Sequence, residues 1–321
     1  MSSPSSLSAD QPKISVVMPV YNGAPWLAVA LDSISAQTVR DFEWIAVDDG
    51  STDESLKILR RHAARDPRLR IISRPNTGII SALNEGLAAA HGRFIARMDA
   101  DDEAAPNRFA RQLDRFESDP TLVALGSAVT FMDAAGQSVQ ACPRPLAHAE
   151  IEQRLLAGDG GTMIHPAVMA RTDAIRAVGG YRLLQRDAQY YEDLDLYLRL
   201  ARIGSLANLA EPLLRYRVHA ASINFTRHLG RRVVKLAVMR EAYAARGLPF
   251  HPEQFEDRDT HADPALHARE WAATSLAYGS RRVAIGHGWR AVRLRPQDAA
   301  SWRALHYALT APLPSSAGTV H

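Results

Sequence analysis

Two aspartates separated by a single residue follow an apolar segment in the first third of the chain. Asp99 and Asp101 come directly after residues 94–98, FIARM, and Asp102 extends the acidic run. Side chains two apart on an extended backbone point the same way, so both carboxylates face one ligand. Their repulsion raises their pKa values unless a cation neutralises them. Such oxygen ligands suit Mg²⁺ or Mn²⁺, ions that keep positions open for phosphates, and a solvated acidic loop or helix cap is the alternative.

A second acidic stretch, DDGSTD, follows another apolar run. A carboxylate there can accept the imide N–H of uracil, and Gly50 allows a tight turn. Ser51 and Asp53 are typical helix caps, and capping alone explains these two residues. Capping does not explain the adjacent pair of Asp48 and Asp49, so this pair is a candidate ligand contact.

An aromatic residue follows the first apolar run, in the segment PVYN from Pro19 to Asn22. Tyr21 offers a ring face on which a nucleotide base can stack. A tyrosine packed in the core at a strand end is the alternative.

The elements that position these residues alternate in type along the chain. Short apolar runs at residues 14–18, 44–47, 69–72 and 94–98 predict strands, and helical patterns cover residues 26–36, 54–64, 79–90 and 108–117. Such alternation predicts a parallel sheet with helices on both faces. Because ligands bind beyond the carboxyl ends of such strands, the polar segments should gather at one edge of the sheet.

The remaining chain predicts a different arrangement. Strands are expected at residues 123–132, 167–170 and 213–218, with helices at 150–156 and 191–203, and these should pack on the sheet and close the cleft. A basic helical segment begins near residue 226, and residues 250–264 are typical of a linker. Residues 265–311 predict two or three helices broken near Gly286 and Pro296, a faint tetratricopeptide-like hairpin without a repeat.

Three regions follow from this pattern. We expect a disordered tail at residues 1–12, an α/β domain at residues 13–225, and a helical C-terminal extension at residues 226–321. The α/β domain divides into a nucleotide-binding half, residues 13–119, and an acceptor half, residues 120–225.

Composition excludes several classes of protein. The 321 residues are 46% hydrophobic and 23% charged, which is ordinary for a globular protein. The net charge of +3 fits an anionic substrate or membrane surface but is too weak to indicate nucleic acid. Cys142 is the one cysteine, so no intrachain disulfide forms and a reducing compartment is expected. Without a signal peptide or an apolar run of about 18 residues, we expect a cytoplasmic protein, soluble or peripheral at the inner membrane face.

The motifs PVYN, VDDGSTD, NTGIISALNEG and DADD occur in this order. In combination they resemble the family-two glycosyltransferases, over about residues 13–220. The resemblance implies a GT-A fold, a Rossmann-like, mostly parallel sheet flanked by helices. It also implies an inverting glycosyltransferase (EC 2.4) that uses a D-x-D motif and a divalent metal.

The resemblance assigns roles to the first motifs. It places Pro19, Tyr21 and Asp49 on the nucleoside of a UDP-sugar, with Asp48 beside them and Asn22 in the same nucleotide-binding segment. Further along the chain, the resemblance places Arg74 near the diphosphate. It also implies that the amide of Asn84 supports the sugar or the strand that carries the D-x-D motif.

The D-x-D motif is matched by the acidic run after the fourth strand. The resemblance makes Asp99 and Asp101 the D-x-D pair, with Asp101 the more direct metal ligand and Asp99 also near the nucleotide. For Asn84, a helix-surface amide is the alternative to a role in the site.

A base must take the acceptor proton in such a transfer, while the metal stabilises the departing diphosphate. In the family this base is a carboxylate at the start of a helix, often within an E-D pair. The segment YEDLD fits, with Asp193 as the base and Glu192 as the alternate. The helix dipole favours the ionised form of a base, but it also makes first-turn acids common for purely structural reasons.

Two histidines adjoin strand-like segments. GT-A enzymes often take a third metal ligand from a C-terminal histidine, which His219 fits, and His165 is expected near the acceptor or sugar. A hydrogen-bonded structural histidine is the alternative for both.

The predicted partners are a nucleotide-sugar donor, UDP-linked as first choice, and a glycan or lipid-linked acceptor, as in cell-surface polysaccharide or glycolipid synthesis. The basic C-terminal helices are candidates for contact with an anionic bilayer, and a solvated helix face is the alternative.

Other functions stay open. A nucleotidyltransferase would make sugar nucleotides, but the loop PVYNGAPW lacks the lysine typical of that class. A non-catalytic module that binds sugar nucleotides or glycans is the third possibility. A phosphohydrolase is disfavoured, since its D-x-D should follow the first strand.

Overall fold

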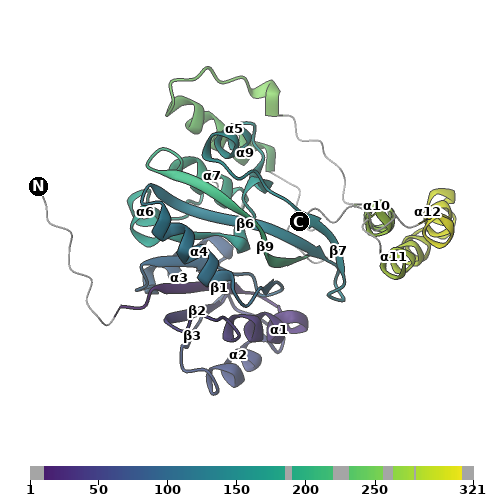
Figure 1. The fold of residues 1–321 in the computed structure, drawn as a ribbon, viewed down its shortest axis with the longest axis horizontal. Coiled ribbons are helices and arrows are strands. Elements are labelled where there is room, and N and C mark those ends of the chain that lie inside the picture. Colours follow the sequence, from purple (N-terminus) through teal and green to yellow (C-terminus); the bar gives the residue numbers. More distant parts are fainter. Residues whose placement is uncertain (1–10, 185–189, 220–230, 256–262, 278–279, 313–321) are drawn as a thin grey trace, which may run out of the picture. The chain divides into compact units, whose positions relative to one another are not determined.

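The computed structural model describes residues 11–184, 190–219, 231–255, 263–277 and 280–312 (Figure 1). The chain forms two compact units. The first comprises Met1–Val129, Pro143–Tyr216 and Gly230–Glu256, and the second comprises Thr130–Cys142, Arg217–Leu229 and Asp257–His321. The regions expected from the sequence stay a prediction, and most of the expected N-terminal tail lies outside the described residues.

The first unit begins with alternating strands and helices. The strands β1 (Ile14–Val20), β2 (Phe42–Asp48), β3 (Leu69–Ser73) and β4 (Phe94–Arg97) pair in parallel, in the order β3-β2-β1-β4. The helices between and after them are α1 (Ala24–Ser35), α2 (Ser55–Ala63), α3 (Ile79–Ala89) and α4 (Arg108–Ser118). The predicted parallel sheet is therefore confirmed.

Helices cover both faces of this sheet. Helix α3 packs on β1 and β2, where Gly86 allows a close approach: a Cβ at Gly86 would lie 2.5 Å from Val17 Cγ1 and 3.5 Å from Val47 Cγ2. Trp44 points to the opposite face, because side chains alternate along a strand. Its ring meets His62 of α2 edge-on, with centroids 5.6 Å apart.

Beyond β4 the sheet continues with antiparallel strands. The order runs β4-β8-β6-β9-β5, with β8 at Met169–Arg171, β6 at Leu122–Met132, β9 at Ser205–Arg217 and β5 at Glu103–Ala104. Strand β7 (Ser138–Cys142) pairs with β6. The expected strand at residues 213–218 is only the second half of β9. Strands β5 and β7 were not predicted.

Shorter elements complete the first unit. The remaining α-helices that the structure describes in it are α5 (His148–Leu156), α6 (Thr172–Ala177), α7 (Glu192–Leu200) and α9 (Arg231–Ala244). Three 3₁₀ turns lie at η1 (Gly160–Thr162), η2 (His165–Ala167) and η3 (Pro252–Phe255). Helix α7 ends three residues earlier than predicted, and most of the expected linker at 250–264 lies outside the described residues.

Among its described residues, the second unit contains the helices α10 (Pro264–Ala277), α11 (Arg281–Leu294) and α12 (Ala299–Thr310). The predicted break near Pro296 is confirmed, but the predicted break at Gly286 is wrong, since Gly286 lies inside α11. One glycine costs a helix only about 1 kcal/mol, and packing of α11 on α10 and α12 offsets that. In the part of the chain that the structure describes, no helix is long and apolar enough to cross a membrane.

Candidate active site

The loop after β1 carries a solvent-exposed tyrosine and an asparagine with a left-handed backbone conformation. Tyr21 is 53% exposed, so its ring is accessible to a ligand, whereas Pro19 is buried in β1. Asn22 adopts a left-handed backbone with φ of 50°, which asparagine tolerates better than most residues. Its Oδ1 accepts from the Thr52 N–H at 2.8 Å, and its own N–H donates to Ser51 Oγ at 3.0 Å. Asn22 therefore joins the loops after β1 and β2.

Asp48 ends β2 and is buried. Its carboxylate accepts from the Ser51 N–H at 3.2 Å and from Ser73 Oγ at 2.9 Å, so it ties the end of β2 to β3. Asp53 accepts from backbone N–H groups at the starts of both α1 and α2, as expected of a cap. Ser51 instead bonds to Asn22 and Asp48.

Asp49 and Arg74, which were both predicted to lie near the nucleotide, form an ion pair with each other. The Arg74 guanidinium donates to Asp49 Oδ1 at 2.8 Å. Asp49 also accepts from the N–H groups of Thr77, at 3.0 Å, and Gly78, at 2.8 Å. These donors fix the loop that enters α3, where Gly78 has a φ of 96°. A contact from Asp49 to a base stays a prediction.

Three carboxylates gather at the end of β4. One oxygen each from Asp99, Asp101 and Asp102 lies within 4.8 Å of the others. Like charges at this separation disfavour the ionised state unless a cation neutralises them, and hard oxygen donors are the ligands that divalent ions prefer. The cluster therefore fits a divalent metal, and it includes Asp102, which was not predicted as a site residue.

A buried cation adjoins this cluster. Arg97 lies in β4 with 4% of its surface exposed and forms an ion pair with Asp99. Burial lowers the pKa of Arg97, but Asp99 raises it above its usual value, so Arg97 stays charged. Burial raises the pKa of Asp99, Arg97 opposes this, and the charges of Asp101 and Asp193 raise it again. The acids at the end of β4 and the acid at the start of α7 therefore share one electrostatic neighbourhood.

Two adjacent acids open α7. Tyr191, just before them, has a left-handed backbone with φ of 59°, which is uncommon for a bulky residue. Burial and the charge of Asp193 raise the pKa of Glu192 to about 8. Glu192 therefore holds its proton at neutral pH and is poorly suited to accept another. The assignment of Asp193 as the base stays a prediction.

His165 contacts the same region from η2. Its Nε2 lies 2.9 Å from the Tyr181 hydroxyl, and its Nδ1 lies 3.9 Å from Glu192 Oε1. Burial and the charge of Arg97 lower the pKa of His165 well below its usual value, so the ring is neutral. His165 therefore lies beside the acid pair, and contact with a sugar or acceptor stays a prediction.

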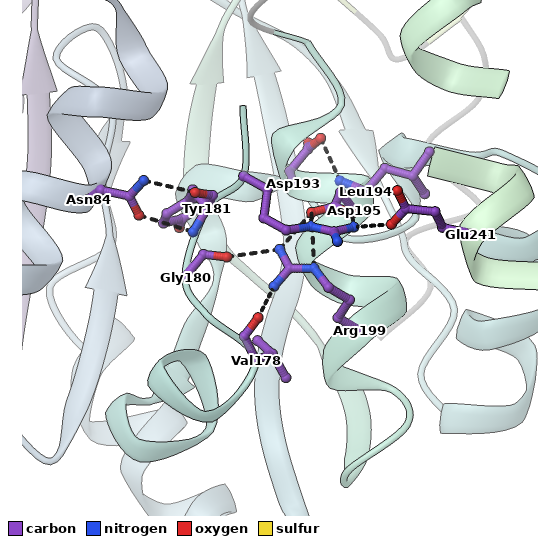
Figure 2. Close-up of polar contacts among 10 residues, drawn as sticks. Asn84, Val178, Gly180, Tyr181, Asp193, Leu194, Asp195, Arg199 and Glu241 are labelled. Atoms are coloured by element: carbon purple, nitrogen blue, oxygen red, sulfur yellow. Dashed lines mark hydrogen bonds and ion pairs between the residues drawn. The ribbon is translucent and has the colours of Figure 1, made fainter. Parts of the chain in front are cut away.

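Asn84 has a defined partner that the sequence did not indicate. Its Oδ1 accepts from the Tyr181 N–H at 3.0 Å, and its Nδ2 donates to the Tyr181 carbonyl at 2.8 Å (Figure 2). The amide of α3 thereby holds the main chain of the residue whose hydroxyl meets His165. Asn84 supports the site through this turn, and its predicted contact with a nucleotide stays a prediction.

The first turn of α7 is held from two sides. Asp195, 2% exposed, accepts from Arg199 at 2.6 Å and forms a second ion pair with Arg182 (Figure 2). Arg199 also donates to two carbonyls in the turn after α6, at 2.6 and 2.8 Å. Arg182 reaches Glu241 of α9 at 2.8 Å. This network fixes the helix end that carries Asp193.

Some residues that support the candidate site gave only weak signals in the sequence. Arg97 is a charge inside the apolar run FIARM, and Asp195 is the last acid of YEDLD. Tyr181 gave no signal, because its place depends on the turn that Asn84 and Arg199 hold. His219 follows β9 in the second unit, so its predicted role as a metal ligand stays a prediction.

Comparison with known proteins identifies the family. The model of glycosyl transferase family 2 matches residues 15–179, about half of the chain. The chain belongs to glycosyl transferase family 2. It is 33% identical over 214 residues to the amylovoran biosynthesis glycosyltransferase AmsE of Erwinia amylovora, a match that covers 65% of this chain and 78% of AmsE. Matches to two other bacterial relatives cover 66% and 76% of their lengths.

Solved structures of other proteins share the fold. Residues 1–349 of S. aureus TarS, in complex with UDP-GlcNAc, align with a TM-score of 0.59 and 18% identity, covering 92% of this chain and 87% of that one. The mannosyltransferase PcManGT of Pyrobaculum calidifontis, in complex with GDP-Man and Mn²⁺, aligns with a TM-score of 0.52 and 19% identity, covering 95% and 83%. The predicted family, enzyme class and GT-A fold are confirmed.

Proposed function

We propose that this family 2 enzyme is an inverting glycosyltransferase that moves a sugar from a nucleotide diphosphate to a hydroxyl group. The observation that carries the proposal is the cluster of carboxylates from Asp99, Asp101 and Asp102 at the end of β4, near enough to Asp193 for its charge to raise the pKa of Asp99. Acids that hold a metal–diphosphate and an acid that takes a proton must both lie near the anomeric carbon for such a transfer.

The acidic cluster supplies the candidate metal ligands. Asp99 and Asp101 would hold Mn²⁺ or Mg²⁺. When bound, the cation neutralises the charge that develops on the departing diphosphate. The Mn²⁺ in the PcManGT complex supports manganese as the first choice.

The loops after β1 and β2 suit the nucleoside. The exposed ring of Tyr21 offers a stacking face, and the ion pair of buried Asp49 with half-buried Arg74 supplies polar groups in the same loops. The TarS complex contains UDP-GlcNAc, whereas the PcManGT complex contains GDP-Man. We take a UDP-sugar as the first choice of donor.

Asp193 would act on the acceptor. Its carboxylate takes the hydroxyl proton as the acceptor oxygen bonds to the anomeric carbon, and the bond from that carbon to the phosphate oxygen breaks. Attack from the face opposite the leaving group inverts the centre. The protonated Glu192 and neutral His165 add hydrogen-bonding groups without adding charge. By likeness to AmsE, we propose a growing polysaccharide as the acceptor and the cytoplasm as the site of reaction.

A donor screen tests the proposal. The purified chain with Mn²⁺ should slowly hydrolyse one UDP-sugar in the absence of acceptor, measured by release of UDP. Arg60→Gln, an exposed change on α2, serves as the control and should keep this activity. Metal-dependent nucleotide binding without turnover would favour the non-catalytic module. Neither turnover nor metal-dependent binding across the common nucleotide sugars would reject the proposed function.

A further inference from the structure

Two tryptophans are exposed side by side in the second unit. Trp289 of α11 is 45% exposed, and Trp302 of α12 is 48% exposed. Their ring centroids lie 6.2 Å apart, at an interplanar angle of 72°. The Trp302 Nε1–H donates to the carbonyl of Pro296 at 2.8 Å, which orients that indole. A pair of large rings left partly in water indicates a surface that meets a partner.

The two rings belong to a continuous exposed stripe. On α11, Arg282, Trp289 and Arg293 recur at intervals of seven and four residues, and all are exposed. On α12, Trp302, His306 and Leu309 recur at intervals of four and three, and all are exposed. Residues at these intervals lie on one side of a helix. We call these six residues the α11–α12 stripe; the two indoles join its halves.

The stripe is basic without balancing acids. The sequences of α11 and α12 contain five arginines, and neither helix contains an aspartate or glutamate. Within the described residues, no carboxylate forms an ion pair with Arg282 or Arg293, whereas Arg281 is used to hold the last carbonyls of α12. A surface of aromatic rings and uncompensated guanidinium groups complements a partner that is negative at its surface and apolar beneath it.

We propose that the α11–α12 stripe docks on an anionic phospholipid bilayer. Indole rings favour the headgroup region, where the apolar ring and the N–H are both satisfied, and arginines pair there with lipid phosphates. A second copy of the stripe is a poor occupant, because a symmetric contact would bring two positively charged stripes together. An acidic peptide would match the charges but leave both indoles and Leu309 without an apolar phase. The docking surface is independent of the proposed transfer.

Vesicle binding tests this surface. The full chain should bind vesicles of phosphatidylglycerol and phosphatidylcholine at least tenfold more tightly than vesicles of phosphatidylcholine alone, measured by co-sedimentation. Arg282→Gln with Arg293→Gln should lower binding by tenfold or more. Arg60→Gln with Arg61→Gln removes the same charge from an exposed helix of the first unit and should leave binding unchanged.

Fluorescence locates the indoles. Lipids brominated in the acyl chains should quench part of the tryptophan emission, and Trp289→Phe with Trp302→Phe should remove that quenching while circular dichroism stays unchanged. Equal binding to both vesicle types, unchanged binding of the Arg282 and Arg293 variant, or dimerisation that depends on Trp289 would overturn the proposal. Because lipid binding is measured without a donor, its failure is distinguishable from absence of transferase activity.

Discussion

At the scale of single residues, the surroundings of the adjacent acids Glu192 and Asp193 decide which of them keeps its proton. Glu192 and Asp193 begin the same helix, where the dipole favours negative charge on both. Burial beside a second carboxylate nevertheless raises the pKa of Glu192 to about 8. Two acids so close do not both ionise easily, and the one that keeps its proton leaves the other free to act as base.

Exchange of each acid for its amide should separate the two roles. Asp193→Asn should lower kcat for transfer by roughly 10²- to 10⁴-fold, the usual contribution of a positioned base, with little change in the Kd for UDP. Glu192→Gln keeps a neutral side chain of the same shape and should retain activity within about tenfold. Steady-state kinetics and calorimetric titration with UDP measure both effects. Greater loss in Glu192→Gln than in Asp193→Asn would exchange the assignments.

Asp66, away from the active site, gives a prediction for pH. Hydrogen bonds from Arg68, and to a lesser degree from Ser35, outweigh burial and lower its pKa to about 2. The folded state therefore favours the ionised form, so the stabilisation is complete above pH 4 and is lost as the pH falls toward 2.

The variant Asp66→Asn should lower the free energy of unfolding by ~2 kcal/mol at pH 7, and this difference should shrink below pH 4. Asp114→Asn removes an exposed carboxylate 3.9 Å from Arg111 and should change stability by no more than ~0.5 kcal/mol. Urea unfolding from pH 7 to pH 3 measures the trend. A difference independent of pH would show that the carboxylate charge is not the cause.

At the scale of elements, most predicted strands and helices occur where hydrophobic periodicity placed them. Strands β1 to β4 and their helices were predictable because each buries a regular pattern against the sheet. The two-residue β5 and the first half of β9 were not, because pairing with distant strands, rather than local pattern, decides them. Gly286 shows the same limit: a glycine that weakens an isolated helix is tolerated in one packed against two neighbours.

Two glycines in α11 should respond oppositely to alanine. Around Gly286 no atom lies within 4 Å of an added Cβ, so Gly286→Ala should raise stability by ~0.5–1 kcal/mol through helix propensity. At Gly288 the added Cβ would lie 2.8 Å from Leu305 Cα, so Gly288→Ala should force α11 and α12 apart and cost ~1–3 kcal/mol. Thermal unfolding by circular dichroism compares them. Equal shifts would contradict the packing of α11 against α12.

At the scale of the whole molecule, folding brings together site residues whose motifs are scattered along the chain. The contact of Asp49 with Arg74 and the position of Asp99 at the end of β4 agree with the rule that strand ends share an edge, whereas the roles of these residues and of Asp193 stay predictions. The roles of Arg97, Tyr181 and Asp195 were not predictable, because each depends on contacts with residues far away in sequence. Sequence patterns did not indicate these supporting contacts, and the chemistry assigned to the site stays a prediction.

Ligand binding should therefore stabilise the folded chain only when metal and nucleotide are both present. UDP with Mn²⁺ at about a hundred times the Kd should stabilise by ~2.7 kcal/mol, and UDP with EDTA should not. Asp101→Ala should abolish the increase in Tm, and the exposed change Asp114→Asn should preserve it. Differential scanning fluorimetry measures the shift. An equal shift with EDTA would remove the metal from the binding mode.

The geometry of the candidate site depends on Gly86, a residue without a side chain. Nothing larger than hydrogen fits between α3 and Val17, so the spacing between helix and sheet is fixed by the missing side chain. Asn84 lies half a turn earlier on the same helix, and its two bonds to Tyr181 tolerate only small displacement. A methyl group at position 86 would therefore displace α3 and weaken the hydrogen bonds of Asn84 to Tyr181, the residue whose hydroxyl contacts His165. The close packing of Gly86 on Val17 therefore sets the position of the Asn84 amide relative to Tyr181.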